Sequence, residues 1–151
     1  MIETEIRSWK KVFEPDLTYI AYELKDIVEK PALILIEGPV GAGKTTFSKV
    51  FIDNDDTFSP TYSVLSDTKD VLHADFYRIK NREEIIHLEI PLYLEDKNYF
   101  LVEWGKQHIQ GINRELSEDF SIYCLDIEIV DSKNEQNPPG RNFVLSQILE
   151  I

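Results

Sequence analysis

The stretch Ile34-Leu-Ile-Glu-Gly-Pro-Val-Gly-Ala-Gly-Lys-Thr-Thr46 decides the fold of this chain. Its apolar start predicts a buried strand, its glycines predict a turn, and the residues from Lys44 onward predict a helix. From Gly38 to Thr45 it fits the pattern G-x-x-x-x-G-K-[ST], in which backbone N–H groups and a helix N-terminus together attract an anion. The stretch therefore predicts a phosphate-binding loop (P-loop) between a strand and a helix.

The side chains of this loop predict a nucleotide with its metal ion. The charge of Lys44 is expected to reach the β- and γ-phosphates, and the Thr45 hydroxyl is expected to bind Mg²⁺. Pro39 has no N–H to donate. The residues of the loop expected to contact ATP or ADP are Gly38, Val40, Gly41, Ala42, Gly43, Lys44, Thr45 and Thr46.

A chance turn is the alternative reading, because a pattern of this kind arises by accident in on the order of one chain in a few hundred. The flanking residues argue against chance. Residues 31–36 form an apolar, β-rich run, while Phe47, Val50 and Phe51 are spaced for one face of a helix. The context is therefore the one that a P-loop requires.

Length and charge narrow the class of protein. A chain of 151 residues is expected to form a single domain, here residues 1–151. With 28 acidic and 16 basic residues its net charge is −12, which works against binding free nucleic acid. No apolar run approaches 18 residues and the first residues are acidic, so we expect a cytoplasmic protein with no membrane partner. The single Cys124 excludes an internal disulfide and is expected to be a packed thiol.

The remaining elements are expected to extend a sheet around the P-loop strand. Alternating or apolar runs predict strands, and residues at three- and four-residue steps predict helices. The expected strands lie at 2–13, 61–66, 71–77, 98–104, 119–130 and 141–148, and the expected helices at 16–29 (with Asp16 as N-cap) and 81–96 (interrupted near Pro91), with a candidate disordered loop at 131–140. Hairpins join some strands and helices join others, which predicts a three-layer α/β domain whose mixed sheet has a parallel core and antiparallel edges.

Two strand ends offer the carboxylate that a P-loop needs for Mg²⁺ and for the attacking water. Glu103 follows the apolar run 99–102, as a Walker-B acidic residue would, and Asp75 follows the run 71–74. Either could instead be a surface carboxylate at the point where a strand leaves the sheet. The P-loop favours the functional reading, with Lys44, Asp75 and Glu103 as the catalytic set.

Four motifs in order resemble the TsaE (YjeE-like) family of P-loop ATPases, which acts in bacterial tRNA threonylcarbamoyladenosine synthesis. They are the P-loop at 38–46, Ser59-Pro-Thr-Tyr62, His73-Ala-Asp-Phe-Tyr-Arg78 and Glu103-Trp104. Gly140-Arg141 before the last strand extends the resemblance over nearly the whole chain. Two departures are a short loop before Ser59 and Pro39-Val40 in place of the more usual acidic residue plus Leu.

The resemblance implies roles for several residues. Thr45 and Glu103 would be the Mg²⁺ ligands, Asp75 would be needed for hydrolysis, and residues 59–61 would form a switch-like loop that brings Thr61 near the γ-phosphate. Arg141 would lie near the nucleotide, and Trp104 would pack or contact a partner there. The family acts as an ATPase on the pathway that modifies position 37 of ANN-decoding tRNAs, in a complex with TsaD-like and TsaB-like proteins, so this chain would meet tRNA only indirectly.

Four other residues carry weaker predictions. His73 is expected to be a packed histidine, and Arg78 to pair with Asp75 or Glu103 rather than to face phosphate. His87 and His108 have no cysteine or acidic partners at zinc spacing.

Two rival functions remain open. The first is a small-molecule P-loop kinase. Such an enzyme needs an arginine-bearing lid, whereas the five arginines here are scattered at positions 7, 78, 82, 114 and 141. A GTPase is disfavoured because no N-K-x-D segment occurs. The second rival is a non-catalytic, nucleotide-dependent interaction module, which an ATPase assay with and without the partners would separate from an ATPase.

Overall fold

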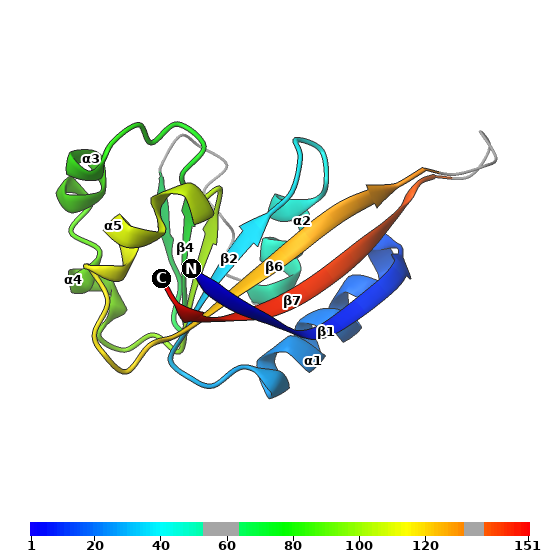
Figure 1. Ribbon diagram of the computed structural model, residues 1–151, viewed down its shortest axis with the longest axis horizontal. Helices are drawn as coiled ribbons and strands as arrows, with labels where there is room; N and C mark the ends of the chain where they lie inside the picture. The colour runs from blue at the N-terminus through cyan, green and yellow to red at the C-terminus, as the bar shows by residue number, and fades with distance from the viewer. Residues whose placement is uncertain (53–63, 132–137) are drawn as a thin grey trace.

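A mixed β-sheet runs through the protein, with strand order β1-β7-β6-β2-β5-β4-β3 (Figure 1). The computed structural model describes residues 1–52, 64–131 and 138–151. The strands are β1 (Ile2–Val12), β2 (Ala32–Glu37), β3 (Leu65–Asp67), β4 (Val71–Asp75), β5 (Tyr99–Glu103), β6 (Ser121–Val130) and β7 (Gly140–Glu150). β2 is parallel to β5 and β6, and β4 is parallel to β5, whereas β3, β7 and β1 pair antiparallel. The predicted mixed sheet with a parallel core and antiparallel edges is confirmed.

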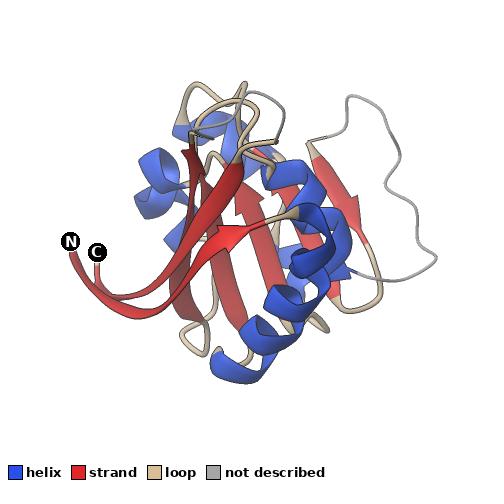
Figure 2. Ribbon diagram, turned by 90° about the vertical axis from the view of Figure 1, so that its right-hand side faces the viewer, coloured by secondary structure: helices blue, strands red, loops and turns tan. Residues whose placement is uncertain are grey.

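Helices cover both faces of this sheet (Figure 2). They are α1 (Leu17–Ile27), α2 (Lys44–Ile52), α3 (Arg82–His87), α4 (Pro91–Leu94) and α5 (Ile109–Asn113), with short 3₁₀ helices η1 (Glu14–Asp16) and η2 (Lys106–His108). Apolar residues of α1 and α2 pack on one face, and those of α3, α4 and α5 pack on the other. The three predicted layers are therefore present. Among the described helices, none combines the length and the apolar character that crossing a membrane requires.

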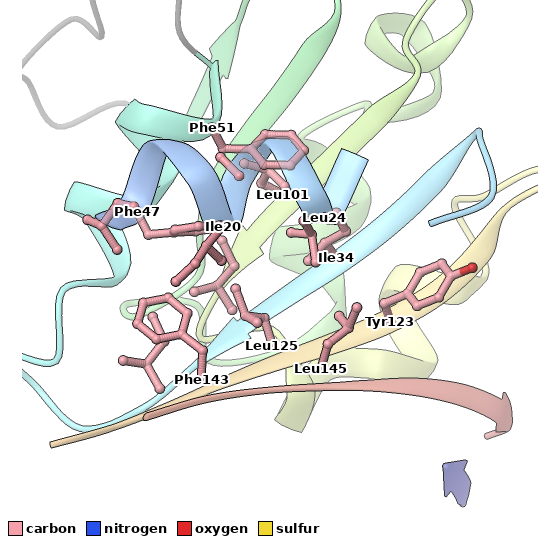
Figure 3. Close-up of a cluster of buried hydrophobic side chains, with 14 of the residues drawn as sticks. Ile20, Leu24, Ile34, Phe47, Phe51, Leu101, Tyr123, Leu125, Phe143 and Leu145 are labelled. Carbon is pink, nitrogen blue, oxygen red and sulfur yellow. The ribbon is translucent and has the colours of Figure 1, made fainter. Parts of the chain in front are cut away.

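The face under α1 and α2 holds an aromatic core (Figure 3). Ile20 and Leu24 of α1 and Phe47 and Phe51 of α2 are buried against the sheet. The Phe47 ring meets the Phe143 ring of β7 edge-on, with centroids 5.6 Å apart. This packing joins the helix that follows the P-loop to the antiparallel half of the sheet.

The P-loop strand β2 is buried on both faces. Ile34 and Ile36 lie in the core under α1 and α2, while Leu33 and Leu35 lie in the core under α3, α4 and α5. Successive side chains of a strand point to opposite faces, so only a continuous apolar run satisfies both cores. The run that predicted this strand thus reflects its central position.

Several local predictions are confirmed. The Asn81 side chain accepts a hydrogen bond from the Glu84 N–H at 3.0 Å and caps α3. Pro91 begins α4, which is the interruption expected in the segment 81–96. Residues 2–12 form an edge strand, and Cys124 is buried and free.

Three local predictions differ from the structure. Asp16 is at the N-cap position of α1 as predicted, but its side chain does not cap that helix, because its carboxylate accepts the Phe13 N–H at 2.9 Å and closes the preceding turn η1. The helix α1 ends at Ile27 rather than near residue 29. The helical segment 106–113 was not predicted, since it is too short to show a helical period. Residues 53–57, the Ser59–Tyr62 motif with Thr61, and 132–137 of the candidate disordered loop lie outside the described residues.

Candidate functional site

The loop between β2 and α2 has the backbone that its glycines predict. Gly41 and Gly43 have φ angles of 83° and 103°, which side chains of L-amino acids rarely adopt. A Cβ on Gly38 would lie 2.5 Å from the Ile127 carbonyl oxygen, so only glycine fits between the loop and β6. The loop therefore curls tightly at the carboxyl end of β2, where ligands of α/β sheets bind.

Lys44 lies inside this curl, at the first residue of α2. Its Nζ donates hydrogen bonds to the carbonyl oxygens of Gly38 at 2.7 Å and Pro39 at 2.8 Å. Burial lowers the pKa of Lys44, against the opposing effect of the Glu103, Glu37 and Asp75 carboxylates. The loop thus holds one buried cation, surrounded by carbonyl oxygens and carboxylates.

Glu103 is the hub of a buried polar cluster at the end of β5. Its Oε1 accepts a hydrogen bond from the Thr45 hydroxyl at 2.8 Å, and its Oε2 lies 2.5 Å from His73 Nε2. The Ser48 hydroxyl also approaches Oε2, at 3.4 Å, and donates to the Lys44 carbonyl oxygen at 2.9 Å. Three neighbours therefore orient a carboxylate that is 2% exposed.

Asp75 lies beside Glu103 on the next parallel strand, because the pairing of β4 and β5 puts the two residues in register. Its carboxylate is exposed, and its Oδ1 accepts the Tyr77 N–H at 3.0 Å. One of the two predicted carboxylates is thus buried and held, whereas the other faces solvent. Arg78 forms no ion pair with either of them within the described residues, contrary to its predicted role.

These residues line one cavity of about 470 Å³. Its volume lies within the range of small-ligand sites, roughly 300–1,000 Å³. The lining residues are Val40, Gly41, Gly43, Lys44, Thr45, Thr46, Asp75, Tyr77, Glu103 and Trp104. The P-loop and both predicted carboxylates, which come from three separate elements, are therefore brought together.

Trp104 covers one side of this cavity from an unusual backbone position. Its φ angle is 60°, in the left-handed region that bulky residues avoid, and such positions concentrate at functional sites. Lys44 Nζ lies 4.2 Å from the centre of the Trp104 ring, and the Tyr77 ring is 5.1 Å from it, centroid to centroid. The strained residue thus places an aromatic face against the cation of the loop.

Arg141 braces the P-loop from β7. Its Nε donates to the Ala42 carbonyl oxygen at 2.9 Å and its Nη2 to the Gly41 carbonyl oxygen at 3.2 Å. A second hollow of about 410 Å³ adjoins the loop here. It shares Gly41, Gly43 and Thr46 with the first cavity and adds the apolar side chains of Phe13, Leu17 and Pro139.

The chain matches known proteins over most of its length. Residues 14–139 match the family model "Threonylcarbamoyl adenosine biosynthesis protein TsaE". This chain belongs to the TsaE family. Similar proteins carry the name "tRNA threonylcarbamoyladenosine biosynthesis protein TsaE" in two bacteria. The Haemophilus influenzae protein is 28% identical over 123 residues, which are 74% of this chain and 77% of that one. The Bacillus subtilis protein is 32% identical over 106 residues, which are 64% of this chain and 65% of that one.

A solved structure supports the fold of this TsaE-family chain. The crystal structure of Bacillus subtilis YdiB superposes with a TM-score of 0.62 and 22% identity, over 98% of this chain and 88% of that chain. At this level of identity the likeness shows the fold alone. The family itself, which the four sequence motifs indicated, is confirmed by the match of residues 14–139 to the family model.

Some site residues of this TsaE-family chain escaped the sequence-based prediction. Ser48 follows Thr45 by three residues on α2, so helical spacing was a usable signal. His73 was expected only to pack; it is buried as expected, but it packs against Glu103. Glu37 accepts the Gly105 N–H at 3.2 Å and fixes the turn after Trp104, and burial raises the pKa of Glu37. Nothing local in the sequence predicts such long-range contacts.

Proposed function

We propose that this chain binds and hydrolyses ATP, with Mg²⁺, as the ATPase subunit required for the threonylcarbamoyladenosine modification of position 37 in ANN-decoding tRNAs. The names of the relatives in Haemophilus influenzae and Bacillus subtilis assign those proteins to this biosynthesis. The observation that carries the proposal is the single cavity lined by Lys44, Thr45, Asp75 and Glu103. We further propose that the protein acts in the cytoplasm, in a complex with TsaD-like and TsaB-like proteins.

The P-loop residues would bind and orient the triphosphate. Lys44 would exchange its bonds to the Gly38 and Pro39 carbonyl oxygens for the β- and γ-phosphates. The N–H groups at the start of α2 would face the same phosphates. The apolar hollow beside Arg141 offers room for the nucleoside.

The Thr45 hydroxyl and the Glu103 carboxylate would hold Mg²⁺. The two oxygens lie 2.8 Å apart, and both are of the hard oxygen type that this ion prefers. When bound, Mg²⁺ neutralises charge on the phosphates and helps to align them. The buried contacts of Glu103 with His73 and Ser48 would keep its carboxylate aimed at Thr45.

Asp75 would orient or polarise the attacking water. Its carboxylate is exposed on the cavity side, and its contact with the Tyr77 N–H fixes its direction. Unlike the buried Glu103 carboxylate, the Asp75 carboxylate is exposed, so a water molecule or a group from a partner protein could reach it. This role requires the charge of the side chain, not only its size.

Partner proteins would complete the site. A chain of net charge −12 gains little from counterion release on tRNA, so another subunit would hold the RNA. ATP hydrolysis by the isolated chain would then be slow, as in enzymes that receive a catalytic residue in trans. We expect at least about a tenfold higher rate with a TsaD–TsaB complex, roughly 1.4 kcal/mol off the barrier.

A coupled ATPase assay with and without the TsaD–TsaB complex, beside filter binding of tRNA at near-physiological salt, tests the proposal. The Asp75→Asn chain mixed with the same partners serves as the control for contaminating activity. An ATPase rate indifferent to the partners, or micromolar or tighter tRNA binding by the chain alone, would contradict it. Partner binding that requires ATP without any hydrolysis would favour the non-catalytic module, and phosphoryl transfer to a small acceptor would favour the kinase.

A further inference from the structure

A separate cavity of about 460 Å³ lies between α3 and the segment formed by η2 and α5. Its lining is rich in hydrogen-bond donors and includes no acidic residue. The lining residues are Arg82, Ile85, Gln107, His108, Ile109, Gln110, Gly111 and Arg114. It shares none of them with the P-loop cavity, although the short turn 104–108 connects the two sites.

Two arginines at this cavity form no ion pair among the described residues, although acidic residues outnumber basic ones in this chain. Arg82 and Arg114 form no ion pair among the described residues, whereas Arg7 pairs with Glu23 at 2.9 Å. They are two of the five arginines in a chain of net charge −12. Both side chains are exposed, and because the lining holds no acidic residue, the two arginines give it a positive formal charge in an acidic chain.

The His108 ring lines the same cavity. Its Nε2 atom is buried and has no hydrogen-bond partner in the described part of the chain. The ring is held edge-on against Phe76, with centroids 6.1 Å apart. Because the Nε2 atom has almost no accessible surface, a ligand in the cavity does not reach it, and the His108 ring forms part of the cavity wall.

We propose that this cavity is an oxyanion site that binds a phosphate group. Two guanidinium groups match the two negative charges of a phosphate, and each can bind it through two parallel hydrogen bonds. The amide groups of Gln107 and Gln110 supply further donors for the remaining oxygens. The site is distinct from the P-loop and does not depend on nucleotide binding there.

Titration of the ¹⁵N-labelled chain with inorganic phosphate at low ionic strength tests the site by NMR. Saturable shifts are expected at the amides of Gln110 and Gly111, separately from shifts at Gly41 and Gly43 of the P-loop. In the double variant Arg82→Gln/Arg114→Gln the apparent affinity at Gly111 should weaken by about tenfold or more. The P-loop shifts should persist, which also shows that the variant folds.

Arg78→Gln is the matched control, because it removes the same charge at an arginine that does not line the cavity. Its Gly111 response should equal that of the parent chain. A response at Gly111 that is absent, unsaturable or unchanged in the double variant would overturn the proposal.

A second titration with a short oligoribonucleotide that carries no terminal phosphate identifies the source of the phosphate. Shifts at Gly111 that the double variant loses would assign the site to the RNA backbone. If only inorganic phosphate produces such shifts, the site belongs to a small phosphorylated ligand. A Gly111 response to a glutamate-rich peptide that exceeds both would contradict phosphate as the ligand.

Discussion

The parallel half of the sheet, β2, β4 and β5, differs in length, burial and use from the antiparallel half, β6, β7 and β1, in which β6 also pairs parallel with β2. β2, β4 and β5 have 6, 5 and 5 residues, and four or five residues of each are buried. β1, β6 and β7 have 10 or 11 residues and form the long curved ribbon at the other side of the sheet, and β1 is mostly exposed (Figure 1). Asp75 and Glu103 lie at the carboxyl ends of β4 and β5 and line one cavity with Lys44 of α2, whereas β7 braces the loop through Arg141. The candidate site thus lies where short buried strands end together, and the long ribbon supports it by packing.

The largest expected effect concerns the candidate site at the end of the parallel half of the sheet. Lys44→Ala should weaken ATP binding by about a thousandfold, because the one buried cation of the loop is lost while the phosphate charge remains. Isothermal titration calorimetry measures this, with Lys49→Ala as the control, since that lysine is exposed on the same helix. Unchanged affinity in Lys44→Ala would show that the P-loop assignment is wrong.

The second effect separates the two carboxylates of this half. Asp75→Asn should keep ATP binding and reduce turnover by at least a hundredfold or so, because an amide cannot polarise the attacking water. Glu103→Gln should instead raise the Mg²⁺ concentration needed for nucleotide binding by about tenfold. Steady-state rates and Mg²⁺ titrations measure both changes.

Asp96→Asn, an exposed carboxylate near the opposite end of β5, serves as the control and should change neither quantity. If Glu103→Gln lost only turnover and Asp75→Asn only the Mg²⁺ response, the two roles would have to be exchanged.

The third effect concerns packing in the antiparallel half of the sheet. Leu145 on β7 is fully buried, so Leu145→Ala should lower the free energy of unfolding by about 2.5 kcal/mol through lost packing. Leu149 on the same strand is 59% exposed, and Leu149→Ala should cost less than about 0.5 kcal/mol. Urea denaturation measures both. ATP affinity measured well below the transition should not change, and a loss there would mean that the two halves are coupled.

The smallest effect concerns Cys124 on β6, and it depends on pH. Burial raises the pKa of the Cys124 thiol far above its usual value of about 8.5, so only the unfolded chain loses this proton in mild alkali. The unfolded state then binds fewer protons, and the stability that is present below pH 8 declines as the pH rises. Between pH 7 and pH 9.5 the parent chain should lose about 1.4 kcal/mol more stability than Cys124→Ala. Parallel denaturation curves for the two chains at both pH values measure the difference, and equal losses would contradict it.

Sequence reasoning succeeded where one stretch of chain determines its own structure. The glycines at 41 and 43, the apolar run of β2 and the cap at Asn81 each act within a few residues, so the P-loop and the element order could be predicted. Strand register could not be predicted, because pairing depends on residues distant in sequence. The contact between His73 and Glu103 follows from that register, and it therefore appeared only in the structure.

The helical segment η2 and α5 was missed for a related reason. Only Ile109 and Ile112 are buried in α5, and two residues do not make a detectable period. The segment is stabilised by its packing on α3 and the sheet rather than by its own sequence. The donor-rich cavity that it forms with α3 was accordingly invisible in the sequence.

The internal bonds of Lys44 have a consequence for the speed of binding. The Lys44 ammonium group already donates to two carbonyl oxygens and lies against the Trp104 ring. Its positive charge is therefore stabilised within the protein before any ligand binds. An incoming triphosphate would have to displace these contacts before it gains its own, so association would include an opening step after the first collision. The observed rate of nucleotide association should then level off at high ATP concentration instead of rising linearly. The same arrangement favours ligands with several phosphates over inorganic phosphate, because each further phosphate adds contacts after the same opening step.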